Sequence, residues 1–312
     1  MMNGNRRDFR DYFSTHYMKI LVTGGCGFIG SHVVESLLKQ QCDVCVIDIQ
    51  NTWIIANVRY YQFNIMDRLA VEKVVEKEKP DVCIHLAGIL GTTETWDYIE
   101  HTVNTNINGA NNVYDVCGKN KCDIITVDVG SRWLSPYTIT KTCSADFALA
   151  IANKYKVRCG LLRIFNVYGP RQSTKIIKIA PMFIHNAFAN MELEIWGNKN
   201  TDLIYVTDVA DAFVLAVFNL DRINGRRDLY IGSGHQLTTA EFAQIIVDKV
   251  GKGTIVHKCA RLGEEQISSG YMNNTTTLDL LGWKPTVDLD DGLNRTIEYY
   301  MGMNIVDNFK QF

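Results

Sequence analysis

Tyr137 and Lys141 are the residues of this sequence with the clearest capacity for chemistry. They lie four positions apart in Ser135–Lys141, at the predicted start of a helix, so they share one helix face. An ammonium group near a phenol lowers the phenol's pKa and makes it a usable base near neutral pH. Such a base could take a proton from a sugar hydroxyl while hydride leaves the same carbon for a nicotinamide. A tyrosine and a lysine four residues apart also occur by chance on helices, so the catalytic interpretation depends on the other motifs of the chain.

A glycine-rich segment, Gly24–Gly30, supplies the second signal. Gly24, Gly27 and Gly30 follow a predicted strand and precede a predicted helix. Glycines at this spacing permit a tight turn and let the backbone approach a pyrophosphate, which then rests on the positive end of the helix. This segment predicts a dinucleotide-binding site.

Asp48 closes the next predicted strand, 18 residues beyond Gly30. A carboxylate there can accept both ribose hydroxyls of NAD and would repel the 2′-phosphate of NADP. Aspartates also start turns, but the glycine segment at this distance favours the ribose role. The predicted cofactor is therefore NAD.

These residues need an α/β framework to bring them together. Strand and helix patterns alternate in the first half of the chain, which predicts a doubly wound parallel Rossmann sheet with ligands at the carboxyl ends of its strands. The predicted strands are Lys19–Thr23, Asp43–Ile49, Arg59–Phe63, Asp81–Leu86, Asp123–Asp128 and Arg158–Phe165, and the predicted helices are about 28–40, 67–78, 96–118 and 135–155.

After Pro170 the pattern loosens into a smaller α+β lobe. Helices are expected near 178–190, 208–220, 238–250 and 289–301, and strands near 203–207, 228–231 and 254–257. We expect a polar N-terminal arm at 1–17, a cofactor domain at 18–166 and a substrate lobe at 167–312. Part of that lobe, about 203–231, is expected to return to the cofactor domain.

Composition excludes several functional classes. A net charge of −2 gives no basic field for a nucleic acid. No apolar stretch reaches the length of a membrane span, and residues 1–17 lack the apolar core of a signal peptide. The nine cysteines are scattered, and Cys42 and Cys45 are expected on opposite faces of a strand, so no metal site is predicted. An odd count without a disulfide framework suggests a reducing cytoplasm.

From Met18 to about Tyr300 the chain resembles the extended short-chain dehydrogenases/reductases of the NAD-dependent epimerase/dehydratase group, which act mainly on nucleotide sugars. Besides the two signals above, the resemblance rests on motifs spread in order along the chain. These are His85–Gly88, Asn106–Gly109, Arg163–Arg171, Ile204–Val209 and Leu281–Pro285.

The resemblance implies further site residues. Phe28 and Ile29 would flank the pyrophosphate, and Asn64 and Ile65 would edge the adenine. Leu86, Ala87 and Gly88 would line the cofactor, and Asn106 would support the nicotinamide region. Lys141 would also hold the nicotinamide ribose. Asn166 would meet the substrate, and Arg261 resembles an arginine that grips a nucleotide diphosphate, although an isolated arginine is as often a solvated surface charge.

Three departures from the group affect the expected reaction. The segment between the fifth strand and Tyr137 is shortened, so the usual catalytic Ser/Thr has no clear successor, and we rank Ser131 and Asp128 above Thr126. Dehydratases of the group have Thr-Asp-Glu there, and only the aspartate is present, which counts against that reaction. A diphosphate-binding arginine is also missing near 197–206, and Lys199 and Arg171 are the candidates to replace it as a point charge.

The leading hypothesis is oxidation of a nucleotide-sugar hydroxyl, expected at C4, with Tyr137 as base. Return of the hydride to the other face of the sugar would make a 4-epimerase, and release of the keto sugar would make a 4-dehydrogenase. A 4,6-dehydratase ranks third. A non-catalytic NAD-binding scaffold or sensor is the alternative outside enzymes, and the intact Tyr137/Lys141 pair counts against it. The helices at 96–118 and 135–155 resemble a pair that forms dimers in this group, so a homodimer or higher homo-oligomer is expected.

Overall fold

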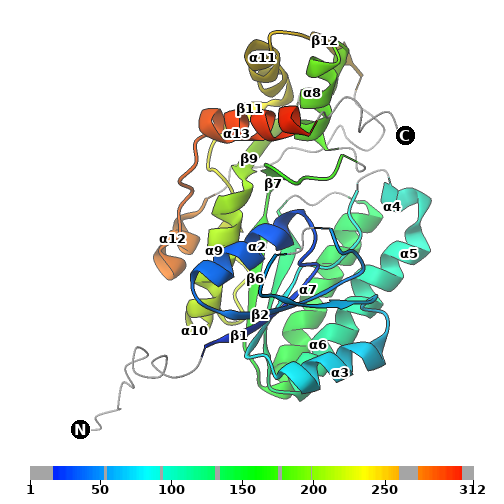
Figure 1. Cartoon of the computed structure of the whole chain (residues 1–312), viewed down its shortest axis with the longest axis vertical. Helices are drawn as coiled ribbons and strands as arrows, with labels where there is room; N and C mark the ends of the chain where they lie inside the picture. Colours follow the sequence, from blue (N-terminus) through cyan, green and yellow to red (C-terminus); the bar gives the residue numbers. More distant parts are fainter. Residues whose placement is uncertain are drawn as a thin grey trace.

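The structure is a computed structural model that describes residues 17–52, 55–91, 94–130, 134–174, 178–197, 199–259 and 273–303. A sheet flanked by helices forms the larger lobe, and a smaller lobe lies beyond the carboxyl ends of its strands (Figure 1). No helix in these ranges combines the length and apolar character needed to cross a membrane.

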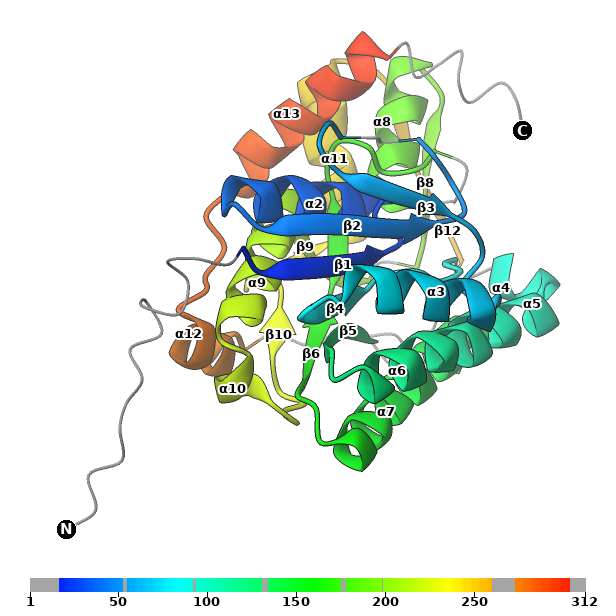
Figure 2. The same ribbon diagram turned by 60° about the horizontal axis from the view of Figure 1, so that its bottom comes forward.

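Seven strands form the main sheet, and all of their pairings are parallel. Their order is β10-β6-β5-β4-β1-β2-β3 (Figure 2). The bounds are β1 (Lys19–Thr23), β2 (Asp43–Asp48), β3 (Arg59–Gln62), β4 (Val82–His85), β5 (Asp123–Val129), β6 (Cys159–Ile164) and β10 (Tyr230–Ile231). This confirms the predicted Rossmann sheet. The order reverses between β1 and β4, which is where such sheets bind ligands at their carboxyl edge.

Helices cover both faces of the sheet (Figure 2). On one face, α2 (Phe28–Lys39) and α9 (Val206–Phe218) share an apolar core with β1 and β2. On the other face lie α3 (Arg68–Glu78), α6 (Ala110–Lys119) and α7 (Pro136–Tyr155), with their own core. Cys42 packs in the first core and Cys45 in the second, so the two thiols lie on opposite sides of the sheet.

The segment predicted as one helix at 96–118 is broken into several helical pieces. It contains α4 (Glu94–Asp97), α5 (Ile99–Val103), a π-helical stretch η1 (Asn104–Gly109) and α6. Inside η1, the Asn106 side chain is bonded to the backbone of Ile89 and to the Thr140 hydroxyl. Wider turns of this kind occur often at functional sites, where they reposition a side chain. Asn106 is such a side chain.

The smaller lobe has its own core. Helices α8 (Ile179–Phe188), α11 (Thr239–Val250) and α13 (Leu289–Gly302) pack with a parallel pair, β8 (Glu192–Trp196) and β12 (Thr254–Lys258). A three-stranded sheet contains β7 (Asn166–Tyr168), β9 (Asn200–Tyr205) and β11 (Gln236–Thr238). Short helices α10 (Leu220–Ile223) and α12 (Thr275–Leu281) complete the described elements. The strands β7, β8 and β11 were not predicted, because three to five residues leave little periodicity to detect.

Candidate active site at the carboxyl edge of the sheet

The glycine segment is packed so closely that its glycines are required. Gly24 has a φ of +74°, and its N–H donates to the Ile47 carbonyl at 2.8 Å. A Cβ on Gly24 would lie 2.7 Å from the Ala87 backbone nitrogen, and one on Gly30 would lie 2.0 Å from the Gly24 carbonyl oxygen. The turn therefore brings β1, β4 and α2 to one point.

The first turn of α2 is open to an anion. Its N-cap, Gly27, has no side chain to bind the free N–H groups, and this turn has no acidic residue. Phe28 and Ile29, expected beside the pyrophosphate, are the first two residues of the helix and are partly buried. Free N–H groups at a positive helix end fit a pyrophosphate.

Asp48 lies against the glycine segment. One carboxylate oxygen accepts from the Cys26 N–H at 2.9 Å and the other from the Gln50 N–H at 2.9 Å. The Thr52 hydroxyl donates to the Cys26 carbonyl at 3.1 Å, so the chain after β2 folds back over the segment. Asp48 is thus fixed at the end of β2, where the ribose role requires it.

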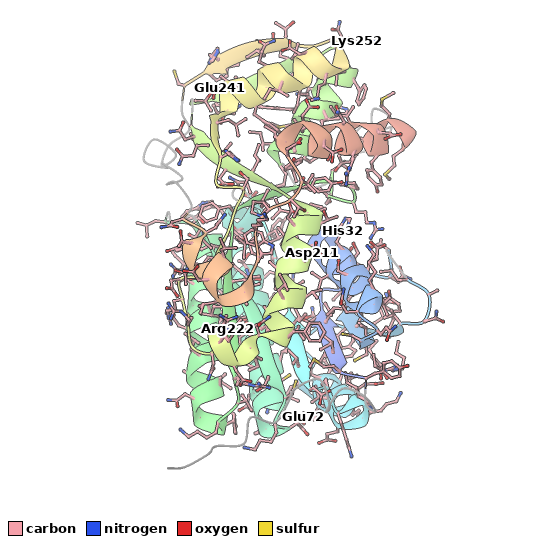
Figure 3. All side chains as sticks on the ribbon, turned by 90° about the vertical axis from the view of Figure 1, so that its left-hand side faces the viewer. His32, Glu72, Asp211, Arg222, Glu241 and Lys252 are labelled. Atoms are coloured by element: carbon pink, nitrogen blue, oxygen red, sulfur yellow. The ribbon has the colours of Figure 1, made fainter. Side chains whose placement is uncertain are left out.

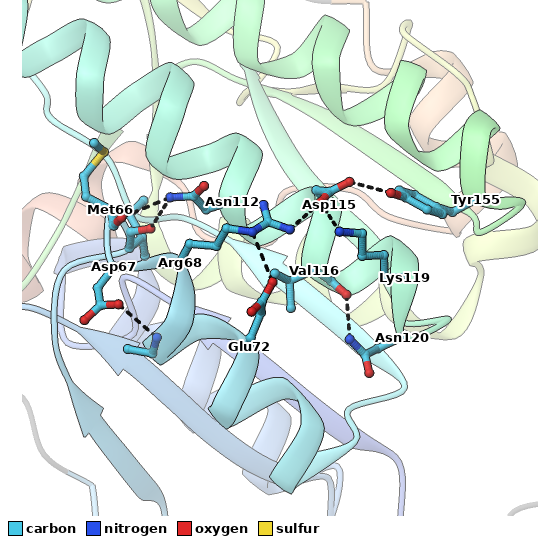
Figure 4. Close-up of polar contacts among 12 residues, drawn as sticks. Met66, Asp67, Arg68, Glu72, Asn112, Asp115, Val116, Lys119, Asn120 and Tyr155 are labelled. Carbon is cyan, nitrogen blue, oxygen red and sulfur yellow. Dashed lines mark hydrogen bonds and ion pairs between the residues drawn. The ribbon is translucent and has the colours of Figure 1, made fainter.

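The expected adenine edge is held from α6. Asn112 donates to the carbonyl oxygens of Ile65 and Met66 at 3.1 and 3.2 Å (Figure 4). The Asn64 side chain accepts from the Met66 N–H at 3.0 Å and closes this turn. A Cβ on Gly109 would lie 2.9 Å from the Ile65 side chain, so the turn is pressed against the end of η1.

The loop after β4 reaches toward α7. Leu86 and Ala87 donate backbone hydrogen bonds to the Thr23 carbonyl and hydroxyl, respectively. A Cβ on Gly88 would lie 2.9 Å from the Asn106 Oδ1 and 3.8 Å from the Lys141 Nζ. Residues predicted from three separate motifs therefore meet around Gly88.

Tyr137 and Lys141 lie in the first turns of α7, a helix that packs against β5; Lys141 is buried and Tyr137 is partly exposed. The helix begins at Pro136, and Ser135 caps it through reciprocal hydrogen bonds with Thr138. Lys141 is 4% exposed, and its Nζ makes no hydrogen bond or ion pair with any described residue. A buried ammonium without a partner fits a site whose acceptors come from a ligand.

The pKa values differ from the expectation for Tyr137. Burial raises the pKa of the Tyr137 phenol to about 12, so the predicted lowering by Lys141 is wrong for this structure. Desolvation by burial, which disfavours the charged phenolate, is the cause of this shift. Burial lowers the pKa of Lys141 to about 8, against the opposing effect of the Asp128 carboxylate.

Asp128, predicted as a possible substrate contact, does not reach the surface. Its side chain is 0% exposed and is ion-paired with Arg163 at 3.0 Å. Its other oxygen accepts from the Val129 N–H at 2.8 Å and the Thr142 hydroxyl at 3.3 Å. Both oxygens of Asp128 therefore already accept hydrogen bonds within the protein, and its contact with a substrate hydroxyl stays a prediction. Ser131, the other candidate, lies outside the described residues.

Thr126, ranked last, is also buried. Its hydroxyl is bonded to the Tyr114 phenol at 2.9 Å and to the His85 carbonyl at 3.4 Å, beneath the site. Tyr114 also bonds Ser144 on α7 at 3.0 Å. Neither Tyr114 nor Ser144 was predicted, because buried hydroxyl pairs leave no spacing signal in the sequence.

The predicted substrate residues lie in different surroundings. Asn166 is exposed on β7, and its amide donates to the Thr201 hydroxyl at 2.7 Å. Lys199 lies just before β9. Arg171 is ion-paired with Glu35 of α2 at 2.5 Å, beside His32 at the boundary of the lobes (Figure 3), so it links the lobes. Arg261 lies outside the described residues.

Comparisons with known proteins agree with this geometry. A family model described as "NAD dependent epimerase/dehydratase family" matches residues 20–132 and 128–232. The chain is 28% identical to a putative UDP-glucose 4-epimerase of Methanocaldococcus jannaschii, over 91% of this chain and 99% of that protein.

Two solved structures are similar over nearly the whole chain. A UDP-glucose 4-epimerase of Thermotoga maritima, solved with UDP-glucose, has a TM-score of 0.86 at 27% identity and covers 92% of this chain and 100% of its own. A UDP-glucuronic acid 4-epimerase of Bacillus cereus, solved with UDP-glucuronic acid and NAD, has a TM-score of 0.83 at 26% identity, with 92% and 100% covered.

Proposed function

Because the chain belongs to the NAD-dependent epimerase/dehydratase family, we propose that it is a nucleotide-sugar 4-epimerase that uses NAD. The observation that carries this proposal is the meeting of Lys141, Asn106 and Gly88 beside the glycine segment, with Tyr137 on the same helix. The similar UDP-sugar 4-epimerases make a UDP-sugar the first substrate to test.

The residues present fit NAD. The open end of α2 would bind the pyrophosphate, Asp48 the adenosine ribose, and Asn64 with Ile65 the adenine edge. Leu86, Ala87 and Gly88 would line the cofactor, and Lys141 would hold the nicotinamide ribose. Bound NAD supplies a hydride acceptor at its nicotinamide ring.

Tyr137 would take the proton of the substrate's C4 hydroxyl as hydride leaves C4. Because burial favours the neutral phenol, positive charge close to Tyr137 must stabilise its phenolate form, and Lys141 is the nearest residue of that kind on its helix. Tyr137 would return the proton when hydride is delivered to the opposite face. Release of the keto sugar before that return would make the protein a 4-dehydrogenase.

The structure gives no support to a dehydratase. Elimination of water needs an acid that can give up a proton to the leaving hydroxyl. Both oxygens of Asp128 already accept hydrogen bonds, from Arg163, Thr142 and the Val129 N–H, so neither is placed to act on a leaving hydroxyl.

We also propose that the protein forms a homodimer through α5 and α7. Ile99 on α5 and Ile139 and Phe147 on α7 are 47%, 54% and 41% exposed, and large exposed apolar side chains favour association. The nine free thiols support the cytoplasmic location expected from the sequence.

The test uses the purified full chain. We expect a nucleotide released by heat to be identified as NAD, and incubation with UDP-glucose, UDP-N-acetylglucosamine or UDP-glucuronic acid to yield the C4 epimer of at least one. Tyr137→Phe should lower this rate by about 10²–10⁴-fold. Tyr17→Phe, at an exposed tyrosine before β1, is the matched control and should retain the rate.

Other outcomes are informative. Accumulation of a keto sugar with reduced cofactor would establish the dehydrogenase instead. Absence of bound NAD, together with a Tyr137→Phe protein indistinguishable from the parent on every sugar nucleotide, would support the scaffold.

A further inference from the structure

Thr140 lies in the first turns of α7, between Tyr137 and Lys141, and its side chain is 2% exposed. A threonine hydroxyl has one hydrogen to donate. That of Thr140 has two backbone carbonyl oxygens of its own helix within reach, the one of Pro136 at 2.7 Å and the one of Tyr137 at 3.0 Å. The hydroxyl is therefore bonded to the turn that carries the proposed base.

The same hydroxyl oxygen accepts a hydrogen bond from another element. The donor is Nδ2 of Asn106, in the π-helical stretch η1, at a distance of 3.1 Å. The direction of this bond is fixed, because carbonyl oxygens can only accept and so take the single hydrogen of Thr140. The bond joins η1 to the first turns of α7, although the two residues are 34 positions apart in the chain.

Asn106 extends this connection to the loop after β4. Its Oδ1 accepts from the Ile89 N–H at 2.7 Å, and its Nδ2 donates to the Ile89 carbonyl at 3.1 Å. Both amide hydrogens of Asn106 are therefore used, one by Ile89 and one by Thr140. Ile89 directly follows Gly88, so one series of hydrogen bonds runs from the expected cofactor-lining loop to the backbone of Tyr137.

The Thr140 hydroxyl is the part of this series that a single substitution can remove. Asn106 is itself 2% exposed, so an amide hydrogen that loses its acceptor would stay unpaired in the interior, at a cost in free energy. Valine has nearly the shape of threonine but accepts no hydrogen bond. A valine at position 140 would thus release the turn of Tyr137 from Asn106 with little change in packing.

We propose that Thr140 is a positioning residue that holds the turn of Tyr137 in place against the cofactor-lining loop. It is covered from solvent, so it acts through Asn106 on one side and through the Pro136 and Tyr137 carbonyl oxygens on the other. This inference deepens the proposed function and rests on it, because Tyr137 and the nicotinamide must act on the same carbon of the sugar. A misplacement of about 1 Å can lower a rate about 100-fold.

The first measurement is steady-state turnover of a sugar nucleotide that the parent protein epimerises. Thr140→Val should lower kcat by about 10–100-fold and leave KM within about threefold, because placement of the base affects the chemical step rather than nucleotide binding. Thr140→Ser keeps a hydroxyl at this position and should restore kcat to within about threefold of the parent.

The second measurement needs no substrate. Exchange of the Ile89 amide hydrogen, followed by NMR of the full-length protein as purified, reports how firmly Asn106 holds the loop, since this N–H donates to Asn106 Oδ1. Thr140→Val should speed up this exchange by about tenfold, because Asn106 loses one of its anchors. Thr140→Ser should exchange at nearly the rate of the parent.

Thr296→Val is the matched control. Thr296 is also a fully buried helical threonine, and its hydroxyl donates to the carbonyl four residues earlier, that of Gly292, at 2.6 Å. It lies on α13 in the smaller lobe and has no bond to Asn106. Its loss removes the same kind of helix bond, so both kcat and the Ile89 exchange rate should equal those of the parent.

Faster Ile89 exchange and lower kcat in Thr140→Val, both restored in Thr140→Ser, support the proposal. Exchange or kcat equal to the parent in Thr140→Val overturns it, as does equal impairment of the serine and valine variants. If the parent turns over no sugar nucleotide, the proposed function fails, and Ile89 exchange still decides whether Thr140 holds the loop. If Thr140→Val does not fold, Thr140→Ala, which also lacks the hydroxyl, replaces it in both measurements.

Discussion

Burial of the charged Lys141 side chain in the active site lowers the stability of the folded protein. Its ammonium is 4% exposed and makes no hydrogen bond or ion pair with any described residue, and burial lowers its pKa to about 8 from the ordinary 10.5. The folded protein therefore binds this proton less tightly than the unfolded chain. Below pH 8 the charged Lys141 costs about 3 kcal/mol of stability, and this cost disappears as pH rises from 8 to 10.5.

Lys141→Met should consequently stabilise the protein while abolishing its reaction. We expect the free energy of unfolding at pH 7 to rise by about 1–3 kcal/mol, measured by urea denaturation. The gain should shrink towards pH 10.5, where lysine is neutral in the unfolded chain as well. A loss of stability at pH 7 would contradict the assignment of Lys141 as a buried charge.

Asp48 governs the choice of cofactor. Asp48→Asn removes the charge that would repel a 2′-phosphate and weakens acceptance from the ribose, so NAD binding should weaken about tenfold and the preference for NAD over NADP should fall. Calorimetric titration of both cofactors into cofactor-free protein measures the ratio. An unchanged ratio would mean that Asp48 only holds the Cys26 and Gln50 N–H groups.

At the scale of elements, a charge network ties α3, α6 and α7 together. Asp115 on α6 accepts from Arg68 of α3 at 2.5 Å and from Tyr155 of α7 at 2.6 Å, and Lys119 lies 3.1 Å away (Figure 4). Burial opposes ionisation of Asp115, but these hydrogen bonds outweigh it and hold its pKa below the usual range. The network fixes the helices that carry Asn112 and the Tyr137/Lys141 pair.

Asp115→Asn should destabilise the protein at pH 7 by about 1–3 kcal/mol, since hydrogen bonds to a charged partner are lost. The contribution of a carboxylate with a lowered pKa is present above about pH 4 and is lost as the pH falls below that. The stability difference between the parent and the variant should therefore shrink steadily as the pH falls below about 4, as measured by thermal unfolding. A difference independent of pH would exclude the charge as its source.

Regular strands such as β1 were predicted well from the sequence, whereas the irregular stretch at 104–109 was not. The strand β1 was predicted residue for residue as Lys19–Thr23, because five apolar-rich residues before glycine leave no alternative. The break in the helix at 104–109 was missed, because Asn106 bonds to Ile89 and Thr140, which lie far from it in sequence. The expected lowering of the Tyr137 pKa was wrong for a related reason, since burial is set by tertiary structure.

At the scale of the whole molecule, the apolar residues exposed on α5 and α7 require an explanation. The proposed dimer predicts that Ile139→Lys combined with Phe147→Lys yields a monomer, because two buried charges would face their copies across the interface. Light scattering after gel filtration measures the mass. Leu278→Lys, at an exposed leucine of α12, is the control and should leave the dimer intact.

The residues expected to bind the cofactor are synthesised before the elements that complete the larger lobe. Every predicted cofactor residue precedes position 142, yet α9 covers α2 and β10 closes the sheet only after residues 206–231 have been made. A nascent chain leaving the ribosome would thus expose the apolar face of β1 and β2 until about two thirds of it had emerged. Nascent chains whose translation is arrested at about residue 200 should bind chaperones rather than NAD. Nascent chains arrested beyond Ile231 should become resistant to protease in the presence of NAD.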